Sequence, residues 1–132
     1  MPTSVAIERI SIRLLLLLNT LVLLLHLAII LKFIPYDIVW GGRLKNDGDM
    51  YFLETISIAA NLLFSFLVMI KGGYINIKVS NKLINILLWV FVVLYLLNTL
   101  GNIFAATIFE KCFAVITLIF ALLTGIVLLS KK

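Results

Sequence analysis

His26 and Glu54 are ionisable residues that stand inside long apolar stretches of the sequence. An ionisable side chain is costly to place in hydrocarbon, so each is a candidate functional residue. Histidine exchanges protons near neutral pH, and a carboxylate can take up or release the same proton. Together the two residue types could carry acid–base chemistry, pass a proton, or hold a polar ligand.

Further polar residues recur in the apolar stretches at helical spacing. Residues three, four or seven positions apart share one face of a helix. Four such faces occur, and we expect them to point toward the axis of one helical bundle. They are Asn19 and His26; Glu54, Ser57, Asn61 and Ser65; Tyr95, Asn98 and Asn102; and Ala114, Thr117, Ala121 and Thr124.

Position along the helices predicts that some of these side chains converge. His26, Glu54, Asn98 and Asn102 lie toward the same end of their helices, beneath a connection that holds Trp40 and Arg43. We expect these six residues to form a polar pocket for a lipid headgroup, a quinone or another small ligand. No catalytic residue is assigned.

A purely structural interpretation is equally open. Polar and small residues join membrane helices through hydrogen bonds of about 0.6 kcal/mol each. Glu54 has three potential partners, Arg43, Lys45 and His26, and such a pair would hold the connection on the bundle. The residues assigned to interhelical polar packing are Asn19, Ser57, Asn61, Ser65, Thr117 and Thr124.

The elements that must position these side chains are four apolar stretches, at about residues 10–34, 52–70, 83–106 and 112–129. Each is about as long as a helix that crosses ~30 Å of hydrocarbon. The chain is 64% hydrophobic, and runs such as Leu14–Leu18 do not alternate as the strands of a barrel would. Residues 1–132 therefore predict a single all-α domain, an integral membrane four-helix bundle with up-down-up-down order.

Charge predicts the orientation of this bundle. Lys and Arg gather on the cytoplasmic side of membrane proteins. One side of the predicted bundle has seven of them and the other four, so we expect both termini in the cytoplasm, in a bacterial inner membrane. The seven are Arg9, Arg13, Lys71, Lys78, Lys82, Lys131 and Lys132; the four are Lys32, Arg43, Lys45 and Lys111.

The net charge of +5 is spread over helix ends, which argues against a nucleic-acid partner. In the connections, Pro35 is expected to end the first span. Gly41-Gly42 predicts an unusual turn, and residues 46–49 predict an ordinary one.

The inventory of ligating residues argues against a cofactor. The chain has one His and one Cys, Cys112, which are too few for a zinc site together with one intramembrane carboxylate. A haem held by two histidines is likewise excluded within one chain, as is an internal disulfide. We therefore expect no metal and no cofactor.

Three functions follow from these observations. The leading prediction is a non-enzymatic accessory or interaction subunit, whose partners are the bilayer and another integral membrane protein or further copies of itself. The first alternative is a protein that binds or transports a small molecule or lipid through the polar pocket. The second is a membrane enzyme acting on a lipid-soluble substrate, with Glu54 and His26 as an acid–base pair.

Overall fold

The structure is a computed structural model that describes residues 2–40 and 43–130, so the turn predicted at Gly41-Gly42 lies outside the described residues. Four of the helices in this part are long and apolar enough to cross a membrane, which indicates a small membrane protein. The helices are α1 (Pro2–Ile30), α2 (Tyr36–Trp40), α3 (Asp47–Lys71), α4 (Asn81–Ile103) and α5 (Ile108–Leu129).

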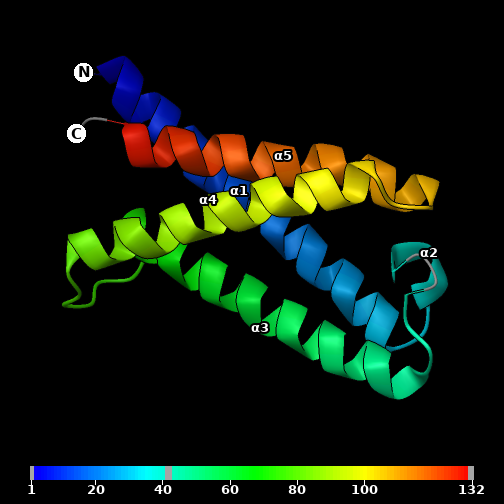
Figure 1. Ribbon diagram of the computed structural model, residues 1–132. Helices are drawn as coiled ribbons and strands as arrows, with labels where there is room; N and C mark the ends of the chain where they lie inside the picture. The colour runs from blue at the N-terminus through cyan, green and yellow to red at the C-terminus, as the bar shows by residue number, and fades with distance from the viewer. Residues whose placement is uncertain (1, 41–42, 131–132) are drawn as a thin grey trace.

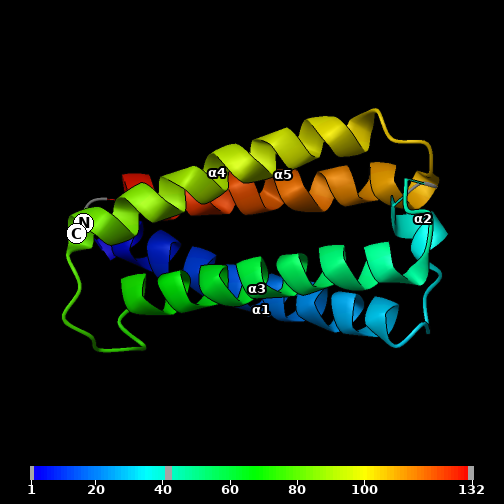
Figure 2. The same cartoon turned by 60° about the horizontal axis from the view of Figure 1, so that its bottom comes forward.

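The long helices form two antiparallel hairpins, α1 with α3 and α4 with α5, and contacts of α1 with α5 and of α3 with α4 join them. The start of α1, the end of α5 and the α3–α4 connection lie at one end of the molecule, here called the terminal end (Figures 1 and 2). The short helix α2 lies at the opposite end, here called the α2 end. In both views α3 and α4 are close at the terminal end and separate toward the α2 end.

A cluster of four aromatic side chains joins three of the helices. Phe64 of α3 has its ring centroid 5.2 Å from those of both Phe91 and Tyr95 of α4. Tyr95 in turn stacks on Phe120 of α5 at 5.0 Å. Aromatic pairs of this geometry contribute about 0.5–1.5 kcal/mol each beyond the burial of their area. The cluster therefore holds the two hairpins together on the terminal side of the point where they diverge.

Helix α1 ends at Ile30 rather than at residue 34, and Pro35 is not what ends it. The N–H of Phe33 donates to the Ala28 carbonyl oxygen (2.9 Å), and the N–H of Lys32 donates to that of Ile29 (3.0 Å). Lys32 has φ +64°, so the helix closes with a left-handed residue that satisfies its last carbonyls. The chain has already turned when it reaches the proline.

All four long helices begin earlier than the predicted spans, and in α3 and α5 polar residues cap the extra turn. Asn46 accepts a hydrogen bond from the N–H of Asp49 (2.9 Å), so α3 starts at Asp47, where the sequence had predicted a turn. Thr107 accepts one from the N–H of Glu110 (3.2 Å), so α5 starts at Ile108 instead of residue 112. Side-chain caps of this kind satisfy backbone donors that a helix start leaves unpaired. The extra turns bring two helix starts close to α2.

Candidate functional site

A cavity of about 340 Å³ lies between the two hairpins toward the α2 end. Its walls come from α1, α2, α3, α4 and α5 and from the connection after α2. Five of the six residues predicted to form a pocket line it: His26, Trp40, Arg43, Asn98 and Asn102. The sixth, Glu54, lies behind the wall, where it contacts His26 and Trp40.

Glu54 is completely buried, and each of its carboxylate oxygens takes part in one hydrogen bond. The indole N–H of Trp40 donates to Oε1 at 2.8 Å. Nδ1 of His26 lies 2.5 Å from Oε2. Of the three partners considered from the sequence, His26 is therefore the one that the fold selects. Because a buried carboxylate is stable only when hydrogen-bonded and charge-compensated, these two contacts explain how it is accommodated.

Arg43 has a different carboxylate partner, Glu110 at the start of α5. Its Nη2 lies 2.5 Å from Glu110 Oε2, and the Glu110 side chain is only 2% exposed. The guanidinium also stands 5.7 Å from the centroid of the Trp40 ring, and its Nε donates to the Trp40 carbonyl oxygen (2.8 Å). The strong cation and the second buried acid at this site thus neutralise each other.

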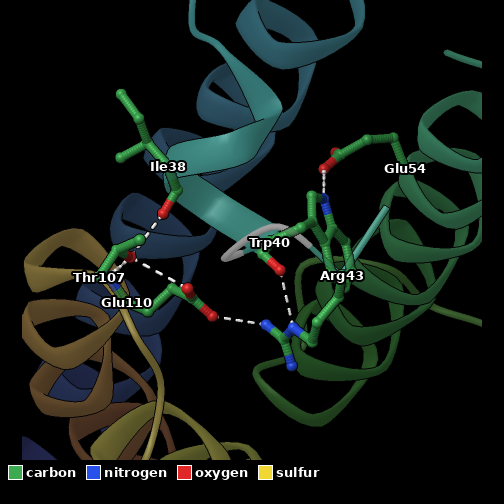
Figure 3. A network of polar contacts seen from close by, with 6 residues as sticks. All are labelled: Ile38, Trp40, Arg43, Glu54, Thr107 and Glu110. Carbon is green, nitrogen blue, oxygen red and sulfur yellow. Dashed lines mark hydrogen bonds and ion pairs between the residues drawn. The ribbon is translucent and has the colours of Figure 1, made fainter. Parts of the chain in front are cut away.

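These contacts fasten the α2 segment, which is α2 together with Arg43, to both hairpins (Figure 3). Trp40 reaches Glu54 on α3, and Arg43 reaches Glu110 on α5. The hydroxyl of Thr107 adds a third connection by donating to the Ile38 carbonyl oxygen at 2.6 Å. The segment therefore crosses the gap at the end where the hairpins diverge and closes the cavity on that side.

A surface ion pair completes the α2 end. Lys32, just after α1, bonds the carboxylate of Asp47, the first residue of α3. The hydrogen bond and the negative charge of Asp47 raise the pKa of Lys32 above its usual value. Both side chains are about half exposed, so this pair lies outside the cavity.

Asn98 and Asn102 stand one turn apart on α4 and face the cavity. No hydrogen bond joins either side-chain amide to another residue in the described part of the chain. Asn98 is exposed and Asn102 is half-buried, and an amide without a hydrogen-bond partner is unfavourable wherever its surroundings are apolar. These two amides therefore have free hydrogen-bonding capacity directed at the cavity.

The cavity reaches the surface between α3 and α4. On α3 it is lined by Ile56, and on α4 by Leu94 and Leu97, each of which is about half exposed. Gly101 of α4 also lines this opening, and a Cβ added there would meet no atom within 4 Å. An apolar molecule could thus pass between the two helices without crossing the polar α2 end.

A second polar layer lies deeper in the bundle and joins helices pairwise. Asn19 of α1 is fully buried and donates to the carbonyl oxygen of Asn61 (2.8 Å) and to the Ser65 hydroxyl on α3. Thr117 of α5 lies 2.9 Å from the hydroxyl of Thr99 on α4. The Asn19 and Thr117 contacts are interhelical, as the packing interpretation expects.

Two other residues assigned to packing do not join helices through hydrogen bonds. The Thr124 hydroxyl is buried but donates to the Phe120 carbonyl oxygen of its own helix (2.7 Å). Ser57 lines the cavity, and its backbone carbonyl oxygen accepts a hydrogen bond from the side-chain amide of Asn61 in the same helix (2.7 Å). The Thr124 hydroxyl thus satisfies its donor on the preceding turn of its own helix.

Sequence reasoning overlooked Glu110, Thr107 and Thr99. The first two form the pattern Thr-x-x-Glu before an apolar run, which is the signature of a capped helix start and would have placed Glu110 in the first turn of α5. Thr99 continues the buried face of α4 that Leu88, Val92 and Tyr95 begin. Both signals are present in the sequence.

Among the described residues, no three His, Cys, Asp or Glu side chains are grouped so that they could hold a metal ion. Cys112 is exposed and unpaired within this part of the chain. No protein-family model, no curated protein and no solved structure matches the chain.

Proposed function

We propose that this is a small integral membrane protein that binds a neutral, lipid-soluble molecule in the cavity between its two hairpins. The observation that carries the proposal is the combination of an opening lined by exposed apolar side chains with two amides, Asn98 and Asn102, that have no hydrogen-bond partner among the described residues. Binding sites of this size are typically apolar cavities with a few convergent polar groups.

The pairing of charges supports a neutral ligand. Arg43 is neutralised by Glu110, and Glu54 is bonded by His26 and Trp40. An anionic or cationic headgroup would have to break one of these pairs, which costs several kcal/mol when a buried charge loses its partner. The groups left free are neutral donors and acceptors.

The position of the opening supports a ligand that arrives through the bilayer. The opening lies between α3 and α4, along the length of the helices, whereas the α2 segment covers the polar end. A lipid-soluble molecule is concentrated in the hydrocarbon that would surround these helices. Its apolar tail can remain there while its polar head occupies the cavity.

A cavity-filling substitution tests the proposal. Gly101→Phe places a ring in the opening, and Gly125→Phe on α5 is the matched control, because an added Cβ meets no atom within 4 Å at either glycine. Each protein is purified in mild detergent and its bound small molecules are extracted and weighed by mass spectrometry. We expect the wild-type and Gly125→Phe proteins to retain a lipid-soluble molecule that Gly101→Phe has lost. Equal retention by all three would refute the cavity as the site.

We also propose that both termini face the cytoplasm, as the asymmetry of Lys and Arg predicts, in a bacterial inner membrane. A single cysteine tests the orientation in a Cys112→Ser chain. Gly48→Cys at the α2 end should react with an impermeant maleimide in intact cells, whereas Asn76→Cys in the α3–α4 connection should react only after the membrane is opened; both positions are exposed. The reverse pattern would invert the topology.

The other two functions remain predictions. An accessory subunit would use exposed apolar helix faces, but such faces pack against lipid as well as against protein. An enzyme would use the Glu54–His26 contact for proton transfer. A partner retained in fixed stoichiometry, or turnover lost without loss of fold when Glu54 is changed, would favour one or the other.

A further inference from the structure

We propose that the bound molecule presents a carbonyl oxygen to the Nε2–H of His26, and that it is a lipid-soluble quinone. This inference deepens the proposed function and rests on it. It follows from the hydrogen-bond pattern around Glu54, from the low polarity of the surroundings, and from the side chains that form the cavity walls.

The contact between Glu54 and His26 holds one proton. The indole of Trp40 can only donate a hydrogen bond, so Oε1 of Glu54 is an acceptor. Oε2 lies 2.5 Å from His26 Nδ1, a contact that requires one hydrogen between the two atoms. That hydrogen belongs either to the carboxyl group or to the ring.

The net charge of the Glu54–His26 pair depends on whether Nε2 carries a second proton. With one proton in the contact and a second on Nε2, the pair is neutral whichever atom holds the shared proton. With Nε2 deprotonated, the pair carries a net negative charge. Glu54 is completely buried, the His26 side chain is only 12% exposed, and the cation nearby, Arg43, is already paired with Glu110. Because an uncompensated charge is costly in such surroundings, the neutral form is favoured and Nε2 carries a hydrogen.

The hydrogen on His26 Nε2 is available to a ligand in the cavity. His26 lines the cavity while its Nδ1 is engaged by Glu54, so its remaining ring nitrogen is the one available to a ligand. An N–H donor inside an apolar cavity calls for an acceptor, and a carbonyl oxygen is the acceptor that a neutral lipid-soluble molecule commonly offers. The amides of Asn98 and Asn102 can donate to a second oxygen on the same molecule.

The cavity walls indicate the shape of the head. Aromatic rings of Trp40, Phe91, Tyr95, Phe109, Phe113 and Phe120 line it. Aromatic walls favour a flat ring, because rings stack and pack edge to face. A quinone combines a flat ring, two carbonyl oxygens and an apolar tail that can leave between α3 and α4. Ester carbonyls of glycerolipids share the acceptor but not the ring.

Tryptophan fluorescence tests the inference. The chain has two tryptophans, and Trp89 is not a lining residue of this cavity. In a Trp89→Phe protein, Trp40 is the sole emitter, and a benzoquinone with a ten-carbon tail should quench it saturably. A Trp40→Phe protein, which retains Trp89, reports collisional quenching in the micelle and should show no saturation.

Two variants separate the donor from the fold. In Glu54→Gln the amide oxygen can still accept from Trp40 and the amide nitrogen can donate to Nδ1, so Nε2 keeps its hydrogen and quinone affinity should change less than about threefold. Adding His26→Leu to Glu54→Gln removes the donor, and the affinity should fall about tenfold, which corresponds to one hydrogen bond. Equal affinity in these two proteins, each unfolding at the same temperature, would overturn the role of His26.

Competing ligands of the same tail length identify the chemistry. A ring ketone should displace the quinone, whereas an alkylbenzene and a short-chain diacylglycerol should not. Displacement by the diacylglycerol as effective as that by the ketone would overturn the quinone class. Saturable Trp40 quenching that is indifferent to a carbonyl would overturn this inference and leave the proposed function standing. Absence of saturable quenching in every protein would refute the inference. The retention of a bound molecule by the wild-type and Gly101→Phe proteins would then test the proposed function separately.

Discussion

The contacts of Glu54 lead to a quantitative prediction for stability. Glu54→Leu replaces the carboxylate by a side chain of similar volume and leaves two polar groups, the Trp40 indole N–H and the His26 Nδ1, without their hydrogen-bond partner. A buried group that loses its hydrogen-bond partner costs about 1–3 kcal/mol. Since both Trp40 and His26 also line the cavity, we take the lower bound for each, about 1 kcal/mol, and expect a total loss of about 2 kcal/mol.

Glu54→Gln is the control because its amide can satisfy both Trp40 and His26 while carrying no charge. We expect its free energy of unfolding to stay within about 0.5 kcal/mol of the wild-type value, half the net contribution of one ordinary hydrogen bond. The measurement is unfolding by sodium dodecyl sulfate in mild detergent, followed by circular dichroism. If Glu54→Gln lost as much stability as Glu54→Leu, the charge of Glu54 rather than its hydrogen bonds would hold the site together. An unchanged Glu54→Leu protein would mean that neither does.

Three further predictions use the same unfolding measurement or hydrogen exchange. Gly101→Ala should stabilise α4 by about 0.5–1 kcal/mol, since a Cβ there meets no neighbouring atom and alanine restricts the unfolded chain; a loss would show that the opening is occupied. A double-mutant cycle of Thr99→Val and Thr117→Val should give a coupling energy of about 0.6 kcal/mol, because their hydroxyls lie 2.9 Å apart. The cycle of Thr99→Val and Thr124→Val is the control and should be additive, because the hydrogen bond of the Thr124 hydroxyl is to the Phe120 carbonyl oxygen and not to Thr99. Arg43→Ala should speed amide exchange in α2 and at the start of α5 more than around the aromatic cluster, because it removes the cation that pairs with the buried carboxylate of Glu110. Equal acceleration in all three places would mean that other contacts hold the α2 segment.

The electrostatic logic of the α2 end follows from its two buried acids. Glu54 and Glu110 each have a carboxylate oxygen paired with a nitrogen from another element: the His26–Glu54 pair joins the two helices of one hairpin, and the Arg43–Glu110 pair ties the α2 segment to the other hairpin. Breaking either pair is costly, because it leaves a buried carboxylate without its partner. Among the described residues the same pairs leave neutral groups free at the cavity, which supports the neutral ligand proposed above.

Local and periodic features could be predicted from the sequence. The four apolar stretches are helices because each residue's N–H and C=O find partners within the same segment, and length alone then identifies the candidate spans. Asn19 and Thr117 are buried and His26 lines the cavity, and a helical periodicity of 3.6 residues per turn accounts for these inward positions. The assignment of the cavity residues to a ligand stays a prediction.

Features that depend on two distant segments were missed or left open. Helix α2 has five residues, too few for any periodic pattern, and its place depends on Trp40 and Arg43 reaching acids far along the chain. Glu54 had three partners open to it, and only the approach of α1 and α3 brings His26 within reach. Glu110 was assigned to a connection, although the capping pattern Thr107-x-x-Glu110 could have shown it inside α5.

The sequence by itself thus determined that the chain forms four long apolar helices and which faces of them are polar, because both properties depend on neighbours within a few residues. The tertiary structure alone decided that the hairpins diverge at the α2 end and that His26 rather than Arg43 bonds Glu54. Those outcomes depend on how aromatic side chains such as Phe64 and Tyr95 pack between helices and so set their separation. Packing of that kind is a property of several segments at once, and no single stretch of sequence records it.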